Sequence, residues 1–197
     1  MNESKIILDA DLINKTLNDG GVIAFVTDTV WGLGCLPNSK QAVEKIYEIK
    51  GRDKSKPLIL MSNNQENLLP YVKEVPEKAK ELMQKHFPGA LTIVLEKSEK
   101  TPLTITSNKN TVGIRVPNNT FFEQLCSVID GHVLATTSAN LSNQPASKTY
   151  EEAVNSIGSF VDIVFEDFGY SCKGKESTVI LVQENDINIL RQGSINI

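Results

Sequence analysis

The chain has 197 residues, of which 40% are hydrophobic and 22% charged, so it is long enough to bury a core and has the composition of a soluble globular protein. No stretch approaches the roughly 18 apolar residues of a membrane span, and the first residues lack the layout of a signal peptide. We therefore expect a cytoplasmic protein without a membrane partner. A net charge of −4 argues against wholesale wrapping of nucleic acid but permits a local basic groove.

Strands and helices are predicted to alternate in the first half of the chain. Strands are expected at residues 6–8, 22–26 and 57–61. Helices are expected from Asp9 to Gly20, from Ser39 to Ile49, near Gln65, and from Pro76 to His86. Between the second strand and the Ser39 helix, residues 27–34 are predicted to form a polar, glycine-bearing loop at the end of a strand.

The second half continues the alternation. Strands are expected at residues 91–95, 111–117 and 132–136, with a polar loop joining the first two. Helices are expected at residues 120–129 and 150–157, and three strands near Val161, Thr178 and Ile189 close the chain. No repeat and no long linker interrupts it, so residues 1–197 are predicted to form one mixed α/β domain.

Three cysteines, Cys35, Cys126 and Cys172, lie far apart, which fits neither a disulfide framework nor a zinc site and favours a reducing compartment. His86 falls on an amphipathic helix and His132 opens a strand, and neither has a partner at ligand spacing. These five side chains are predicted to be structural.

A cluster of cations stands between the Ser39 helix and the following strand. Lys50, Arg52, Lys54 and Lys56 fall within seven residues and are opposed only by Asp53. On an acidic protein, such a stretch suggests a bound anion. It is equally compatible with a solvated helix end, because cations in a last turn complement the helix dipole. Charge alone leaves both interpretations open.

Three other polar features end or interrupt strands, where ligand sites of α/β sheets usually lie. Two of them are the loop at residues 27–34 and the run at residues 136–140, and for both an ordinary turn is the alternative. The other is Arg115, which lies inside an apolar strand. An unpaired buried arginine is costly. Arg115 should therefore face solvent on an edge strand, pair with a buried carboxylate, or hold an anionic ligand.

Several common chemistries are excluded by motif. Residues 169–176 resemble a P-loop, but Glu176 replaces the magnesium-binding Ser or Thr, and a strand rather than a helix is predicted to follow. The dinucleotide-binding, nucleophile-elbow and HExxH motifs do not occur. Cations, hydroxyls and glycines remain, which are the groups that phosphoryl or nucleotidyl transfer requires.

Six blocks, taken in order, carry a resemblance to a known family. They are Thr27-Asp28-Thr29-Val30-Trp31-Gly32-Leu33, Lys50-x-Arg52 with Lys56-Pro57-Leu58, Gly113-Ile114-Arg115-Val116-Pro117, Thr137-Ser138-Ala139-Asn140, Glu176-Ser177-Thr178-Val179, and Leu190-Arg191 with Gly193. Together they cover nearly the whole chain, and the set in this order is highly specific. The chain resembles the YrdC family of threonylcarbamoyl-AMP synthases in its short, single-domain form.

The resemblance implies an open, twisted, mixed β-sheet with flanking helices and a large, concave, basic cavity. It implies that L-threonine, bicarbonate and ATP give threonylcarbamoyl-AMP and pyrophosphate. The product would supply the modification of the adenosine beside the anticodon of ANN-reading tRNAs. Separate tRNA threonylcarbamoyl-transfer proteins would accept it, and direct tRNA contact is a further expectation. Mg²⁺ would be bound mainly through ATP, without a metal site of the protein.

The resemblance also assigns roles to residues. Lys50 and Arg52 are expected to be catalytic, neutralising the triphosphate together with Lys56. The expected ATP contacts are Arg52, Lys56, Thr111, Ser138, Asn140 and Arg191. The expected threonine contacts are Thr29, Arg115, Thr136 and Ser177. Ala146 stands where a serine often contacts ATP, so a backbone contact there and a substitute contact from Ser147 both stay open.

Two alternatives compete with this interpretation. The first is a YciO-like paralogue of the same fold, which would share many of the six blocks. The second is a non-catalytic RNA-binding module that uses the basic cavity. RNA-binding modules usually interleave aromatics for base stacking, whereas aromatics make up only 6% of this chain and none lies within the cationic stretch.

Overall fold

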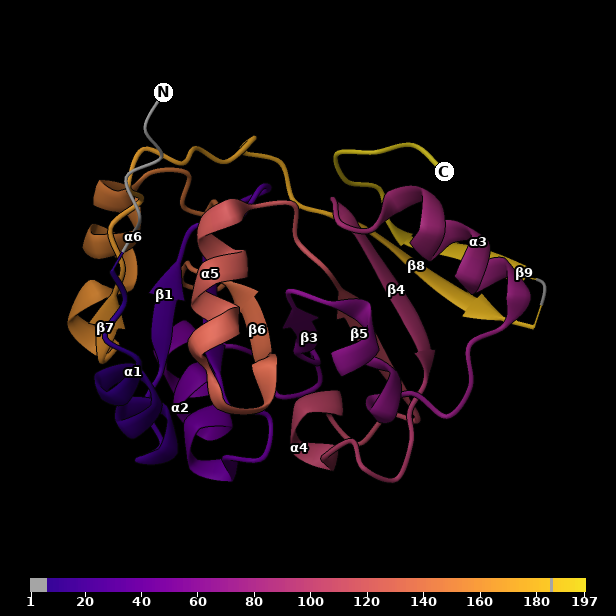
Figure 1. Ribbon diagram of the computed structural model, residues 1–197, viewed down its shortest axis with the longest axis horizontal. Helices are drawn as coiled ribbons and strands as arrows, with labels where there is room; N and C mark the ends of the chain where they lie inside the picture. The colour runs from indigo at the N-terminus through magenta and orange to yellow at the C-terminus, as the bar shows by residue number, and fades with distance from the viewer. Residues whose placement is uncertain (1–6, 185) are drawn as a thin grey trace.

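Nine strands form a single mixed sheet in the computed structural model, which describes residues 7–184 and 186–197. The strand order is β7-β1-β2-β6-β3-β5-β4-β8-β9, and Figure 1 shows it running from β7 at the left to β9 at the right. The strands are β1 (Ile23–Phe25), β2 (Gly32–Cys35), β3 (Ile59–Ser62), β4 (Leu91–Glu96), β5 (Thr111–Arg115), β6 (Val133–Ser138), β7 (Ile163–Val164), β8 (Thr178–Gln183) and β9 (Asp186–Arg191). The predicted mixed α/β class is confirmed.

Three strand pairs are parallel, namely β1 with β7, β3 with β5, and β4 with β8. The other neighbours in the sheet are antiparallel. Strands that are distant in sequence therefore lie side by side, so that the ends of β6, β3, β5 and β8 can contribute to one site.

Helices cover the sheet, with α5 and α3 drawn in front of it in Figure 1. The helices are α1 (Ala10–Asn18), α2 (Lys40–Lys50), α3 (Glu77–His86), α4 (Leu103–Thr106), α5 (Thr120–Val128) and α6 (Tyr150–Ile157), with single 3-10 turns η1 (Gln65–Asn67), η2 (Leu69–Tyr71), η3 (Asp130–His132) and η4 (Gly158–Phe160). Asp9 and Ser39 accept the capping bonds expected of them at the starts of α1 and α2. Among the helices of the described residues, none is long and apolar enough to cross a membrane.

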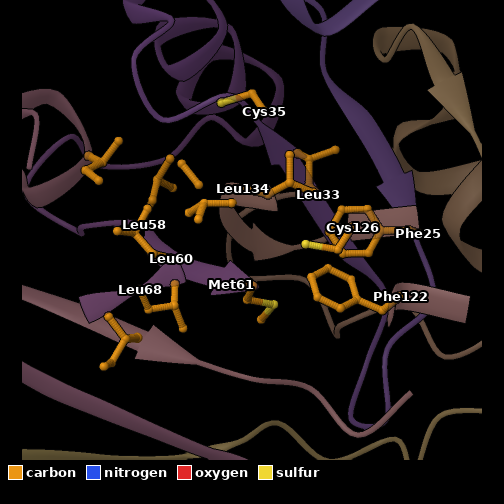
Figure 2. Close-up of a cluster of buried hydrophobic side chains, with 14 of the residues drawn as sticks. Phe25, Leu33, Cys35, Leu58, Leu60, Met61, Leu68, Phe122, Cys126 and Leu134 are labelled. Carbon is orange, nitrogen blue, oxygen red and sulfur yellow. The ribbon is translucent and has the colours of Figure 1, made fainter. Parts of the chain in front are cut away.

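The core lies between the sheet and these helices, and Figure 2 shows part of it. Phe25 of β1 packs against Phe122 of α5, with ring centroids 5.4 Å apart. Leu60 of β3 and Leu134 of β6 are fully buried in the same cluster. This packing fixes the central strands whose ends carry the polar residues.

The largest difference from the predicted elements is β2, which occupies the last three residues of the loop expected at residues 27–34. A Cβ added at Gly32 or Gly34 would meet the ring of Phe25 at 2.8 or 2.9 Å. These glycines therefore make room for Phe25 across the β1–β2 pair. The two glycines therefore belong to a packed strand. The loop between β1 and β2 is shorter than expected and covers residues 26–31.

Smaller differences concern the other boundaries. The polar segment before β5 contains the short helix α4, and His132 lies in the turn η3 rather than at the start of a strand. Of the strand expected at residues 6–8, Ile6 lies outside the described residues, and Ile7 and Leu8 are not in a strand. A strand, β8, follows residues 169–176. This confirms the prediction that no helix follows the segment, as a P-loop would require.

Candidate functional site

A cavity of about 700 Å³ gathers most of the residues singled out in the sequence. Nine of the eleven expected site residues line it: Thr29, Arg52, Lys56, Thr111, Arg115, Thr136, Ser138, Ser177 and Arg191. Lys50 and Asn140 are the two that do not. The lining carries five basic side chains, the four cations in that set and Lys109, against one acidic side chain, Glu176. Such a cavity attracts anions.

Arg115 lies at the deep end of the cavity, in β5, with 2% of its surface exposed. Its guanidinium forms an ion pair with the carboxylate of Asp28, which is 8% exposed. Nε donates to the carbonyl oxygen of Gly89 at 2.9 Å, and Nη1 donates to the hydroxyl of Thr29 at 2.9 Å. Of the three arrangements that the sequence left open, pairing with a buried carboxylate is the one observed, and Arg115 still borders the cavity.

The hydroxyls beside Arg115 form an ordered chain. Thr27 Oγ1 donates to the carbonyl oxygen of Val30 at 2.6 Å, and Thr27 and Thr29 have their hydroxyl oxygens 3.2 Å apart. Because Thr27 uses its proton on Val30 and Thr29 accepts from Arg115, the Thr29 hydroxyl donates to Thr27. These bonds hold the β1–β2 loop in one conformation at the deep end of the cavity.

Arg191, in β9, organises the opposite wall. Its Nη1 donates to Glu176 Oε2 at 2.8 Å, and its Nη2 donates to the carbonyl oxygen of Ser177 at 2.9 Å. The hydroxyl of Ser177 lies 2.8 Å from that of Thr92 in β4. The ion pair between Arg191 and Glu176 is half exposed, so it is open to competition from an anionic ligand.

Arg52 stands at the mouth of the cavity because Gly51 ends α2 in the left-handed region, with φ of 54°. Within the described residues, its guanidinium is held only by long bonds of 3.3 Å to the carbonyl oxygens of Lys56 and Pro57. Partial burial lowers the pKa of Arg52, and the charge of Arg191 lowers it further, while Glu176 raises it. The cations therefore crowd one another, and an anion between them would relieve that repulsion.

Lys50 is placed differently from the expectation. Its side chain is buried, and its Nζ donates to the carbonyl oxygens of Ser138 and Asn140, both at 2.6 Å, and to Asn140 Oδ1 at 3.0 Å. Lys50 therefore does not line the cavity, and its Nζ is directed at the chain, while its expected role toward the triphosphate stays a prediction. The last residue of α2 instead holds the end of β6 in place.

Asn140 belongs to the same assembly. Its Oδ1 accepts from Ser138 Oγ at 2.6 Å as well as from Lys50, and its amide nitrogen donates to the carbonyl oxygen of Gln144 at 2.6 Å. Asn140 thus orients Ser138, which borders the cavity. Ser147 is also used internally, since its hydroxyl donates to the carbonyl oxygen of Ala139 at 2.6 Å, and neither Ala146 nor Ser147 lines the cavity.

The buried position of Lys50 predicts a pH dependence of stability. Burial, together with the charge of Arg52, lowers the pKa of Lys50 from 10.5 to about 7. Between these values the unfolded chain binds a proton that the folded chain has lost, so stability rises with pH. Relative to Lys50→Met, we expect the unfolding free energy of the wild type to rise by up to about 1.4 kcal/mol per pH unit in this window.

Urea denaturation of both proteins at pH 7, 8 and 9 checks this expectation, because all other titrations cancel in the difference. A difference that stays constant across these pH values would contradict the lowered pKa of Lys50.

Asp28, Thr92 and Lys109 are site residues that the sequence interpretation did not assign. Thr92 and Lys109 line the cavity, and Asp28 lies directly behind Arg115. Asp28 stands in the first of the six sequence blocks, between Thr27 and Thr29. No feature of the sequence indicated Thr92, because threonine is common in strands of β-branched residues.

The described residues contain no group of three or more His, Cys, Asp or Glu side chains that could hold a metal ion. Glu176 is the one carboxylate on the cavity lining. A magnesium ion typically takes one or two protein carboxylates and completes its shell with phosphate oxygens and water, and the lining is compatible with that arrangement only when the phosphates are supplied by a ligand.

Comparison with known proteins shows to which family the chain belongs. The Sua5/YciO/YrdC family profile, described as "Telomere recombination", matches residues 15–193. The chain belongs to this family. Among members named threonylcarbamoyl-AMP synthase, that of Pyrococcus abyssi is 35% identical over 179 residues, covering 91% of this chain and 52% of the relative. That of Vibrio campbellii is 32% identical over 181 residues, covering 91% of this chain and 96% of the relative.

The fold is likewise that of the Sua5/YciO/YrdC family. Sua5 of P. abyssi complexed with L-threonine superimposes with a TM-score of 0.87 at 32% identity, covering 95% of this chain and 56% of that one. YciO of E. coli superimposes with a TM-score of 0.81 at 27% identity, covering 95% and 91%. The chain thus spans about half the length of the Pyrococcus protein and nearly the full length of the Vibrio protein.

Proposed function

We propose that this chain is a threonylcarbamoyl-AMP synthase, which converts L-threonine, bicarbonate and ATP into threonylcarbamoyl-AMP and pyrophosphate. The observation that carries the proposal is the lining of one cavity. Arg115 lies there together with the hydroxyls of Thr29, Thr136 and Ser177, and Arg52, Lys56 and Arg191 contribute further cations. These two sets of side chains suit an amino acid and a triphosphate. Relatives that match nine-tenths of this chain carry the same enzyme name.

Carbon–nitrogen bond formation comes first in the proposed mechanism. The ammonium of threonine first loses a proton to solvent. The resulting amine attacks the carbonyl carbon of bicarbonate, and water is released as the carbamate forms. The threonine carboxylate binds to Arg115, with hydroxyls of Thr29, Thr136 and Ser177 around the amino acid. The resulting carbamate is already an anionic nucleophile, so the protein need not supply a strong base.

Adenylyl transfer follows. A carbamate oxygen attacks the α-phosphorus of ATP, the bond to the β-phosphate oxygen breaks, and pyrophosphate leaves with its electron pair. Two anions must meet in this step, and the leaving group gains charge. Arg52, Lys56 and Arg191 would neutralise the phosphates, with Thr111 and Ser138 as further ATP contacts.

Magnesium would enter with ATP, bound through its phosphates and supplying additional charge neutralisation; Glu176 is the nearest protein carboxylate on the lining. The product would pass to separate tRNA threonylcarbamoyl-transfer proteins. Direct tRNA contact would use the cations around the cavity mouth.

Mass spectrometry of a reaction containing the purified chain, ATP, Mg²⁺, bicarbonate and L-threonine tests the function, with pyrophosphate measured in parallel. We expect a threonylcarbamoyl-AMP signal that disappears when either threonine or bicarbonate is omitted. Pyrophosphate without this product would instead indicate transfer to another acceptor, as a YciO-like paralogue would allow. Neither product, together with steeply salt-dependent tRNA binding, would favour the RNA-binding alternative.

A further inference from the structure

Asp28 is the only buried acidic residue in the part of the chain that the structure describes. It lies in the loop between β1 and β2, and its carboxylate is paired with the guanidinium of Arg115 from β5. Asp28 does not line the cavity, whereas Arg115 does. Any influence of Asp28 on a bound ligand is therefore exerted through Arg115.

The ion pair completes a fixed frame around the guanidinium. Nε is bound by Gly89, Nη1 by Thr29 and Nη2 by Asp28, so three of the five N–H groups of Arg115 have partners within the described residues. Three anchors on two different segments, Gly89 before β4 and Asp28 and Thr29 in the β1–β2 loop, prevent the planar group from rotating. One N–H on each Nη is left for a ligand.

The loop that carries Asp28 is itself braced. The carbonyl oxygen of Asp28 accepts from the backbone nitrogen of Lys173 at 3.1 Å, and that of Thr29 accepts from Gly174 at 2.8 Å. The chain then runs through Glu176 and Ser177, which hold Arg191. The carboxylate of Asp28 is therefore a rigid support rather than a mobile surface group.

We propose that Asp28 is a positioning residue for the amino-acid substrate, which fixes the guanidinium of Arg115 so that its two remaining N–H groups receive the carboxylate of L-threonine. This inference rests on the proposed function. It concerns the amino-acid end of the cavity alone, because Asp28 contacts none of Arg52, Lys56 or Arg191 through a hydrogen bond or ion pair in the described residues.

Asp28→Asn tests the inference, since it keeps the shape of the side chain and removes its charge. We expect the Kd for L-threonine, measured calorimetrically without ATP, to rise at least about tenfold, as loss of a charge-assisted contact would produce. The KM for threonine should rise in parallel, while the Kd for ATP and kcat at saturating threonine stay at their wild-type values. Asp19→Asn is the matched control, because its partner is the exposed Lys15, and it should change neither constant.

Two outcomes would overturn the positioning role. One is a folded Asp28→Asn protein with the threonine affinity of the wild type; the other is an equal weakening of threonine and ATP, which indicates general structural damage. If Asp28→Asn does not fold, Asp28→Glu keeps the charge and displaces the carboxylate by one methylene, and the same selective loss is expected with the same criteria. A wild-type chain that binds no threonine would instead refute the proposed function.

Discussion

Replacement of Arg52 by alanine is expected to lower pyrophosphate release by at least about 100-fold, which is the usual cost of removing one donor that stabilises developing charge. Arg52 borders the cavity mouth and is held only by two long bonds to carbonyl oxygens. It is therefore free to turn toward phosphate, and no buried group loses its partner when it is removed. The melting temperature should accordingly stay at the wild-type value.

Lys54→Ala is the matched control for Arg52→Ala. Lys54 belongs to the same cationic stretch but is exposed and does not line the cavity. Steady-state pyrophosphate assays with ATP and threonine varied in turn should show a loss for Arg52→Ala and none for Lys54→Ala. Equal losses would mean that the overall charge of the stretch matters rather than the position of Arg52, and wild-type turnover of Arg52→Ala would remove its catalytic role.

Replacement of Lys50 by methionine is expected to damage both stability and activity. Methionine has a similar length but leaves the carbonyl oxygen of Asn140 without the Lys50 donor, while that of Ser138 keeps only the backbone nitrogen of Asn140. Unsatisfied buried acceptors cost about 1–3 kcal/mol each, and removal of a buried charge offsets part of this cost. We expect a net loss of about 2–3 kcal/mol in unfolding free energy at pH 7.

The activity of Lys50→Met should fall by at least about 100-fold, because Ser138 would no longer be held at the cavity wall and small displacements of site residues have effects of this size. The joint loss separates the two possible roles of Lys50. A direct phosphate ligand would lose activity without losing stability, whereas a structural support loses both. Lys40→Met is the control, since Lys40 lies at the exposed start of the same helix and should change neither quantity. Urea denaturation and the pyrophosphate assay provide the two measurements.

Local structure was largely predictable from sequence because it depends on near neighbours. Ser39 and Asp9 were recognisable as helix caps, and the Thr120 helix and the strand at Leu91 followed from apolar spacing. The strand β2 was missed because its two glycines suggested a loop. Glycine is needed at these two positions because the ring of Phe25 on the neighbouring strand lies against them. No pattern within residues 27–34 reveals this contact.

The sequence by itself determined the mixed α/β class and the cationic stretch after α2, because caps, periodicity and residue type are local properties. Nine of the residues that line the cavity came from the resemblance of the sequence to the family. Only the tertiary structure decided what the side chains of Lys50, Asp28 and Arg115 contact. The side chain of Lys50 reaches residues 88 and 90 positions further along the chain, and Asp28 lies 87 positions from Arg115. A charge in a sequence does not reveal whether it meets solvent, a ligand or another part of the chain, since burial and pairing arise only when distant strands are brought together in the sheet.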